Sequence, residues 1–156
     1  MMRAWGGFWC VAVVLLGLAG RFAPACAQIG AQVGTGTVEV VVHGVRDGRG
    51  HVLVAVCHQW DFLQERCEYN GVAEARQGTV TVHVENVPAG IYAVQAWHDA
   101  NDNGRLERNI VGIPREGVGF SRDPSFSLGP PRFGSASFAV GVRGGQTALT
   151  LRYLLN

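Results

Sequence analysis

Residues 99–107 carry the side chains with the clearest capacity for chemistry in this sequence. The segment reads DANDNGRLE, with Asp and Asn at alternate positions ahead of a glycine. Oxygen-bearing side chains in this spacing are typical of an EF-hand calcium loop, in which the glycine permits a sharp turn. Aligned from the first residue, ligand positions 1, 3, 5, 7 and 9 fall on Asp99, Asn101, Asn103, the backbone carbonyl of Arg105, and Glu107.

The loop departs from the calcium pattern at its strongest ligand. Position 12 normally carries a bidentate acid, and here it is Ile110. Asp102 or Glu116 would have to supply the missing oxygen from elsewhere. Because only Asp99 and Glu107 are charged among the aligned ligands, we expect weak affinity, of roughly 10⁻⁴–10⁻³ M, as in extracellular calcium modules.

The alternative interpretation of residues 99–107 is a turn that binds no metal. Asn and Asp tolerate left-handed backbone conformations and bond their own backbone. Asn103-Gly104 is also a strong hairpin signal. The sequence therefore predicts a polar loop at a strand end, and both interpretations remain open at this point.

Four further residues near the loop are candidates for contacting a ligand: His98, Arg115, Glu116 and Arg122. The two arginines lie in the glycine-rich stretch GIPREGVGFSRDP, where they would meet an anion if the stretch binds a ligand. Otherwise this stretch simply closes one end of the domain. For His98 the alternative to a site role is a hydrogen bond to a loop carbonyl. We identify no catalytic residue, because no serine lies in a nucleophile elbow and the histidines lack metal-ligand spacing.

The elements that must position these residues are β-strands. Valine-rich segments with period-2 alternation are separated by Gly, Pro and Asn; they are residues 37–45, 50–57, 79–87, 90–99, 133–141 and 147–155. This pattern predicts an all-β fold, a single antiparallel Greek-key sandwich of about seven strands. We expect one short helical excursion near 59–67 and a long loop over 99–132.

The N-terminal residues are typical of a secretory signal peptide. Arg3 precedes an apolar run over 8–19, and Ala25-Cys26-Ala27 gives a small-residue cleavage pattern. We expect cleavage after Ala27, a flexible leader over 28–36 and a β-sandwich domain over 37–156. The apolar run is shorter than the roughly 20 residues that a membrane span needs. The sequence thus predicts a periplasmic or secreted protein with no membrane span after cleavage.

Two cysteines, Cys57 and Cys67, remain after that cleavage. An even pair in a small exported domain predicts a disulfide. Their spacing suits neither a CxxC redox motif nor a zinc knuckle. The part of the chain after residue 27 has 11 arginines, no lysine and 12 acidic residues, without a basic run. We therefore expect no nucleic acid partner.

A longer stretch resembles a known family. VPAGIYAVQAWHDANDNGRLERNIVGIPREGVGFSRDP, followed by GPPRFGSASFAV, is similar to the DUF2141 family of exported bacterial proteins. The resemblance spans about 37–153. It implies a signal peptide and a small β-sandwich like those of transthyretin and carboxypeptidase regulatory domains. It implies no assigned activity, and the segment between the cysteines is not part of the family's core pattern.

These observations predict an exported accessory or binding module of unassigned activity, whose partner is an unknown protein or cell-envelope ligand. One alternative is a weak calcium-binding module in which the 99–107 loop orders residues 108–132 for partner contact. Another is a hydrolase-like enzyme of the transthyretin-related type. That enzyme's C-terminal Tyr-Arg-Gly-Ser motif is missing here, where the chain reads LRYLLN.

Overall fold

The computed structural model describes residues 34–64, 66–125 and 129–155. The predicted signal peptide, with its cleavage after Ala27, lies outside the described residues, as does most of the predicted leader over 28–36. Within the described part of the chain, no helix is long and apolar enough to cross a membrane.

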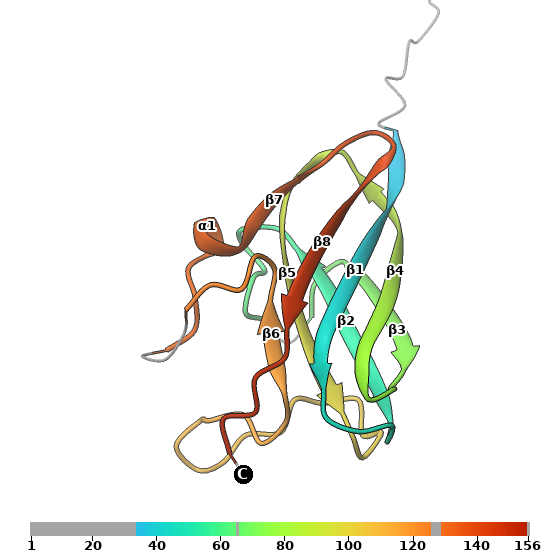
Figure 1. Cartoon of the computed structure of the whole chain (residues 1–156). Coiled ribbons are helices and arrows are strands. Elements are labelled where there is room, and N and C mark those ends of the chain that lie inside the picture. Colours follow the sequence, from blue (N-terminus) through green and yellow to red (C-terminus); the bar gives the residue numbers. More distant parts are fainter. Residues whose placement is uncertain (1–33, 65, 126–128, 156) are drawn as a thin grey trace, which may run out of the picture. The chain divides into compact units, whose positions relative to one another are not determined.

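The described residues form a two-sheet β structure, so the predicted all-β class is confirmed (Figure 1). The elements are β1 (Thr35–Val45), β2 (His51–Cys57), β3 (Tyr69–Glu74), β4 (Gly78–Pro88), β5 (Gly90–Asp99), β6 (Val118–Phe120), α1 (Phe133–Ala136), β7 (Ser137–Val140) and β8 (Gly144–Thr150).

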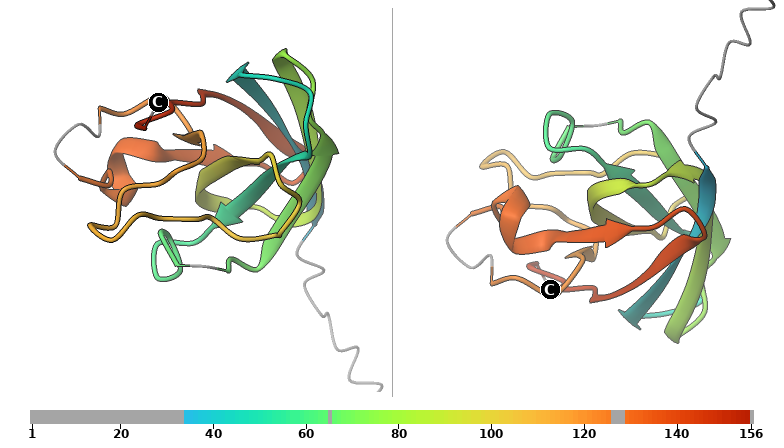
Figure 2. Two further views of the ribbon diagram at one scale, coloured as in Figure 1. Left: turned by 90° about the horizontal axis from the view of Figure 1, so that it is seen from below. Right: turned by 90° about the horizontal axis from the view of Figure 1, so that it is seen from above.

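One sheet has the strand order β4-β1-β8, and the other has the order β3-β2-β5-β6 with β7 also paired to β5. Seen along the strands, the two sheets lie face to face (Figure 2). The named strand pairs are antiparallel except β1 with β8, which is parallel. The predicted antiparallel arrangement therefore holds apart from this one pair.

Alternating valines explain the core. Because successive side chains of a strand point to opposite faces, every second residue of β1 and β4 turns inward and is buried, while the residues between are more exposed. The inner faces of the two sheets meet through Val38, Val40, Val42, Val82, Val84 and Leu149 on one side and Val52, Val54, Val56, Tyr92, Val94 and Ala96 on the other.

The five-stranded sheet is also covered on its outer face. Its outward residues Ala55 and Ala93 pack with Phe62, Phe120 and Ala136 in a second buried cluster. Phe62 comes from the turns after β2, and Ala136 comes from α1. Both faces of β2 are buried, which explains why this strand carries apolar residues on both sides.

The segment between β2 and β3 differs from the prediction. The helical excursion expected near 59–67 is a series of hydrogen-bonded turns, with Phe62 N–H donating to His58 O and Gln64 N–H to Asp61 O, each at 3.0 Å. Leu63 has a φ of 71°, which is incompatible with continuing a helix. The chain then enters β3, a strand that the alternation did not predict.

The disulfide between Cys57 and Cys67 is present, as predicted. It joins the last residue of β2 to the segment just before β3, and both cysteines belong to the second buried cluster. The bridge therefore holds the intervening turns against the outer face of the five-stranded sheet.

Candidate functional site

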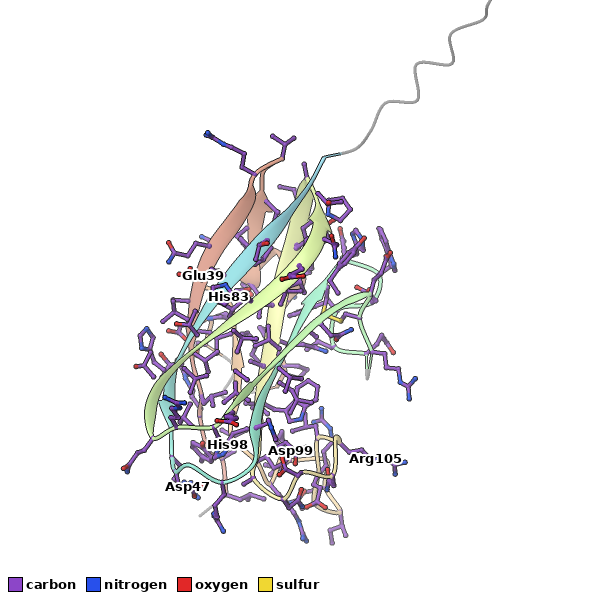
Figure 3. All side chains as sticks on the ribbon, turned by 90° about the vertical axis from the view of Figure 1, so that its right-hand side faces the viewer. Glu39, Asp47, His83, His98, Asp99 and Arg105 are labelled. Carbon is purple, nitrogen blue, oxygen red and sulfur yellow. A yellow bond between two sulfur atoms is a disulfide. The ribbon has the colours of Figure 1, made fainter. Side chains whose placement is uncertain are left out.

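The 99–107 loop starts where β5 ends, and Asp99 is fixed there by its neighbours. Asp99 is the last residue of β5 and lies opposite His51 in β2. Gly50 makes this approach possible: its φ is +65°, and a Cβ there would lie 1.9 Å from the Asp99 carbonyl oxygen. Asp99 is only 2% exposed. Figure 3 places it with His98 at one end of the sandwich, with Arg105 on the loop beyond.

The Asp99 carboxylate organises the loop. Its Oδ1 accepts the N–H of Asn103 at 3.1 Å, and its Oδ2 accepts the N–H of Gly104 at 2.6 Å. The Asn103 side chain continues the network, because its Oδ1 accepts the N–H of Arg105 at 2.8 Å and its Nδ2 donates to Glu107 at 3.0 Å. Gly104 has a φ of +70°, as the Asn-Gly turn signal predicts.

Glu116 lies beside this loop in an environment that disfavours its ionised form. Its residue is 8% exposed, and its Oε1 is buried without a hydrogen-bond partner. Its Oε2 accepts the N–H of Glu107, at 3.4 Å. Burial is the main cause that raises the pKa of Glu116 to about 7; the charges of Asp99 and Glu107 raise it further, while the amides of Glu107 and Ala100 oppose the shift.

Asp102, the other candidate for the missing oxygen, is engaged elsewhere. Its Oδ1 lies 2.6 Å from Nδ1 of His51, and this hydrogen bond raises the pKa of His51. Glu116 contacts the loop through the N–H of Glu107. Ile110 itself is fully exposed.

The three carboxylates of Asp99, Glu107 and Glu116 do not yet converge. Among the described residues, the one group of three metal-ligating side chains with ligand atoms within 4.8 Å of one another is Cys57, Asp61 and Cys67. Its two thiols are already joined in the disulfide, so it is not a metal site in the oxidised protein. A cation at the 99–107 loop would have to draw Glu107 and Glu116 towards Asp99.

His98 is held by two hydrogen bonds in the interior. It is 1% exposed, with Nε2 2.8 Å from the carbonyl of Arg49 and Nδ1 2.8 Å from the hydroxyl of Tyr153. A carbonyl only accepts, so Nε2 donates; in a neutral imidazole Nδ1 then accepts the O–H of Tyr153, whose oxygen accepts the Arg46 N–H at 2.9 Å. Both ring nitrogens are thus used in joining the β1–β2 link to the C-terminal segment.

Arg115 and Arg122, the two arginines selected from the sequence, are exposed, and neither is among the described residues that line the pocket presented below. Arg122 donates to the carbonyl of Ser137 at 3.0 Å, which ties the segment after β6 to β7. Residues 108–115 form a small hairpin closed by the Arg108–Pro114 bridge, so the long loop expected over 99–132 is partly ordered into turns and β6.

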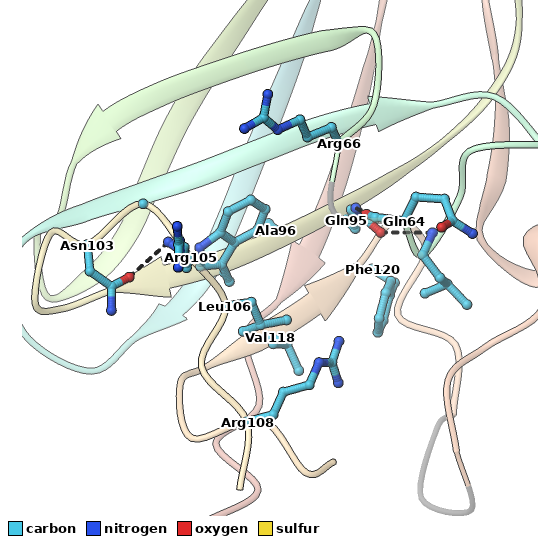
Figure 4. A pocket seen from close by; sticks show the side chains of 13 residues that line it. Gln64, Arg66, Gln95, Ala96, Asn103, Arg105, Leu106, Arg108, Val118 and Phe120 are labelled. Carbon is cyan, nitrogen blue, oxygen red and sulfur yellow. Dashed lines mark hydrogen bonds between the residues drawn. The ribbon is translucent and has the colours of Figure 1, made fainter.

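A pocket that the sequence did not indicate lies beside the same loop (Figure 4). Its volume is about 580 Å³, and three arginines line it: Arg66, Arg105 and Arg108. They come from the turns before β3 and from the 99–107 loop and the residue after it. No sequence signal points to this gathering, because the arginines are brought together only when both segments fold against β5.

Of the comparisons with known proteins, the one with family models gave a match. Neither curated proteins nor solved structures gave a match to the chain. A family model described as "Uncharacterized protein conserved in bacteria (DUF2141)" matches residues 40–148, which include β2 to β7 and all the loop residues described above. The chain therefore belongs to the DUF2141 family of bacterial proteins.

Proposed function

We propose that this protein is an exported bacterial binding module whose 99–107 loop, completed by Glu116, binds a calcium ion. Calcium takes six to eight oxygen ligands in flexible geometry. Asp99, Asn101, Asn103 and Glu107 offer side-chain oxygens, the Arg105 carbonyl adds another, and Glu116 supplies the acid that the loop lacks at position 12.

The observation that carries the proposal is the unpaired oxygen of Glu116. A buried carboxylate oxygen without a donor is costly, and it faces a loop that already contains two other acids. A divalent cation would remove the cost in one step, since it neutralises the repulsion and satisfies Oε1.

The present contacts of Asp99 suit this role. In the loop as folded, its carboxylate accepts the amides of Asn103 and Gly104, and these contacts shape the turn before any metal arrives. Calcium binding would then order the segment after the loop, because Glu116 lies just before β6 and Glu107 lies at the start of the 108–115 hairpin.

Thermal melts of the purified protein in EDTA and in millimolar calcium test the proposal. We expect the melting temperature to rise with calcium, with half-saturation at roughly 10⁻⁴–10⁻³ M, and calorimetric titration to give the same constant. Glu116→Gln should lose the shift. The matched control is Glu85→Gln, which neutralises an exposed glutamate on β4 away from the loop and should keep it.

Two results would count against calcium binding: a melting temperature that calcium leaves unchanged in the wild type, or an equal calcium shift in Glu116→Gln. A parallel titration with magnesium separates a calcium site from general screening of the acids. Magnesium demands a tighter octahedral geometry, so we expect a much smaller shift at equal concentration.

A further inference from the structure

We infer that the arginine-lined pocket binds a small amphipathic organic anion, a molecule with an apolar body and a carboxylate or phosphate group. The pocket lies between Leu63, Gln64 and Arg66 on one side and the loop at 103–108 on the other, over strands β5 and β6. This inference goes beyond calcium binding and does not require it.

Three arginines give the pocket a positive lining. Arg66 stands on one wall and Arg105 and Arg108 on the other, and no Asp or Glu is among the lining residues that the structure describes (Figure 4). Arg49 and Arg76 form ion pairs elsewhere, with Asp47 and Glu74. A cleft lined by charges of one sign concentrates the opposite charge, and guanidinium groups bind carboxylate and phosphate through paired hydrogen bonds.

The floor of the pocket is apolar. Trp97, Leu106, Val118 and Phe120 contribute to it, and β5 pairs with β6 directly beneath, with Gln95 opposite Phe120 and Trp97 opposite Val118. The volume of about 580 Å³ falls within the range of roughly 300–1,000 Å³ that small-molecule sites occupy. A ligand with charge alone would leave this floor unused, so an apolar body is part of the inference.

The first wall is already fixed in place. The Gln95 side chain accepts the N–H of Leu63 at 3.1 Å and donates to the carbonyl of Gln64 at 2.9 Å. The Cys57–Cys67 disulfide closes the same segment. A pre-formed wall lowers the ordering cost of binding, so the pocket is ready for a ligand without a large rearrangement.

The experiment uses 8-anilinonaphthalene-1-sulfonate as the probe, with the purified protein in EDTA. We expect its fluorescence to rise and saturate, and added salt to weaken the binding. Octanoate and octyl phosphate should displace it, whereas octanol and octylamine at the same concentration should not. The stronger of the two displacing anions shows whether the pocket prefers a carboxylate or a phosphate.

Variants assign the binding to this pocket. Arg66→Gln and Arg105→Gln remove the charge and leave a polar side chain, and together they should weaken the sulfonate probe about fivefold or more, the scale of one modest ion-pair contribution. Arg143→Gln, at an exposed turn away from the pocket, is the matched control and should bind like the wild type. N-phenyl-1-naphthylamine has the same rings without the sulfonate, and its binding should not depend on the arginines.

The inference is overturned if the sulfonate probe fails to saturate, if octanol displaces it as well as octanoate, or if the arginine variants bind it like the wild type. Should the double variant fail to fold, the single variants and the competition series on the wild type still decide. All these titrations are in EDTA, so their result does not depend on whether calcium raises the melting temperature.

Discussion

Three acidic residues at or beside the 99–107 loop differ in how their carboxylates are hydrogen-bonded. Asp99 is buried yet satisfied, because two backbone amides meet its carboxylate. Glu116 is buried and half satisfied, because only Oε2 has a donor. The Asp102 carboxylate is instead hydrogen-bonded to the His51 ring. The sequence presents these three acids as equivalent. The structure separates them, because of the three it is Glu116 that keeps a buried carboxylate oxygen without a hydrogen-bond donor.

We predict that Glu116→Gln stabilises the protein when no metal is present. The amide keeps an oxygen that can accept the Glu107 N–H, and it removes a buried charge, so the free energy of unfolding in EDTA at pH 8 should rise by about 1–3 kcal/mol. Urea denaturation followed by circular dichroism measures this change. The exposed control Glu85→Gln should stay within about 0.5 kcal/mol of the wild type. A less stable Glu116→Gln in EDTA would mean that Glu116 contributes a contact rather than a cost.

At the scale of elements, β5 positions almost everything of interest. Its Gln95 side chain anchors the disulfide-closed turns, and Trp97 forms part of the pocket floor. The same strand ends in His98 and Asp99, which fix the β1–β2 link and the candidate calcium loop. The loop and the pocket are therefore neighbours because one strand supports both.

The register of β2 and β5 depends on Gly50, and we predict that Gly50→Ala is strongly destabilising. A Cβ at this position would lie 1.9 Å from the Asp99 carbonyl oxygen, so the strands must separate where Asp99 is held. Gly104→Ala is the matched control, because Gly104 has a similar φ of +70° but no atom within 4 Å of its Cβ position. It should lose only the left-handed backbone penalty, about 1 kcal/mol.

Denaturation midpoints of the two variants measure the difference. We expect Gly50→Ala to lose at least about 2 kcal/mol more than Gly104→Ala, the range of steric strain in a packed site. Equal losses would show that the backbone conformation alone, and not the close approach to Asp99, explains the glycine.

For the whole molecule, the sequence predicts the strands whose side chains alternate regularly. It does not predict the elements that form only when distant segments of the chain pack together. Alternating valines are sufficient for β1, β2 and β4, and the cysteine pair is sufficient for the disulfide. The edge strand β3 reads YNGVAE, which has no clear apolar face, and β6 has only three residues. Both take their strand form from their partners, which a local pattern cannot contain.

The same limit applies to the candidate sites. The 99–107 loop is visible in the sequence because its polar residues are adjacent. Glu116 could be named as one source of the missing oxygen, but only tertiary contacts separate it from Asp102. The pocket arginines have no local signature at all, since Arg66 lies far along the chain from Arg105 and Arg108.

The packing of the sandwich makes a final prediction about alkaline pH. Tyr69, Tyr92 and Tyr153 all have raised pKa values, chiefly because burial disfavours the tyrosinate, and the pKa of Tyr69 is raised to about 12. The folded protein therefore keeps phenolic protons that the unfolded chain loses above pH 10, the ordinary value. Because the unfolded state binds fewer protons in this range, the free energy of unfolding must fall as pH rises from 10 towards 12.

Near-ultraviolet absorbance of tyrosinate, recorded against pH, checks this prediction. In the native protein the absorbance should rise well above the midpoint found for the same protein in guanidinium, and unfolding midpoints should shift to lower denaturant over the same pH range. Tyr69→Phe should flatten the part of the stability loss nearest pH 12, because Tyr69 has the pKa of about 12. Native tyrosines that ionise together at the denatured midpoint would instead mean that water reaches the Tyr69–Tyr92 contact, whose ring centroids lie 5.9 Å apart between β3 and β5.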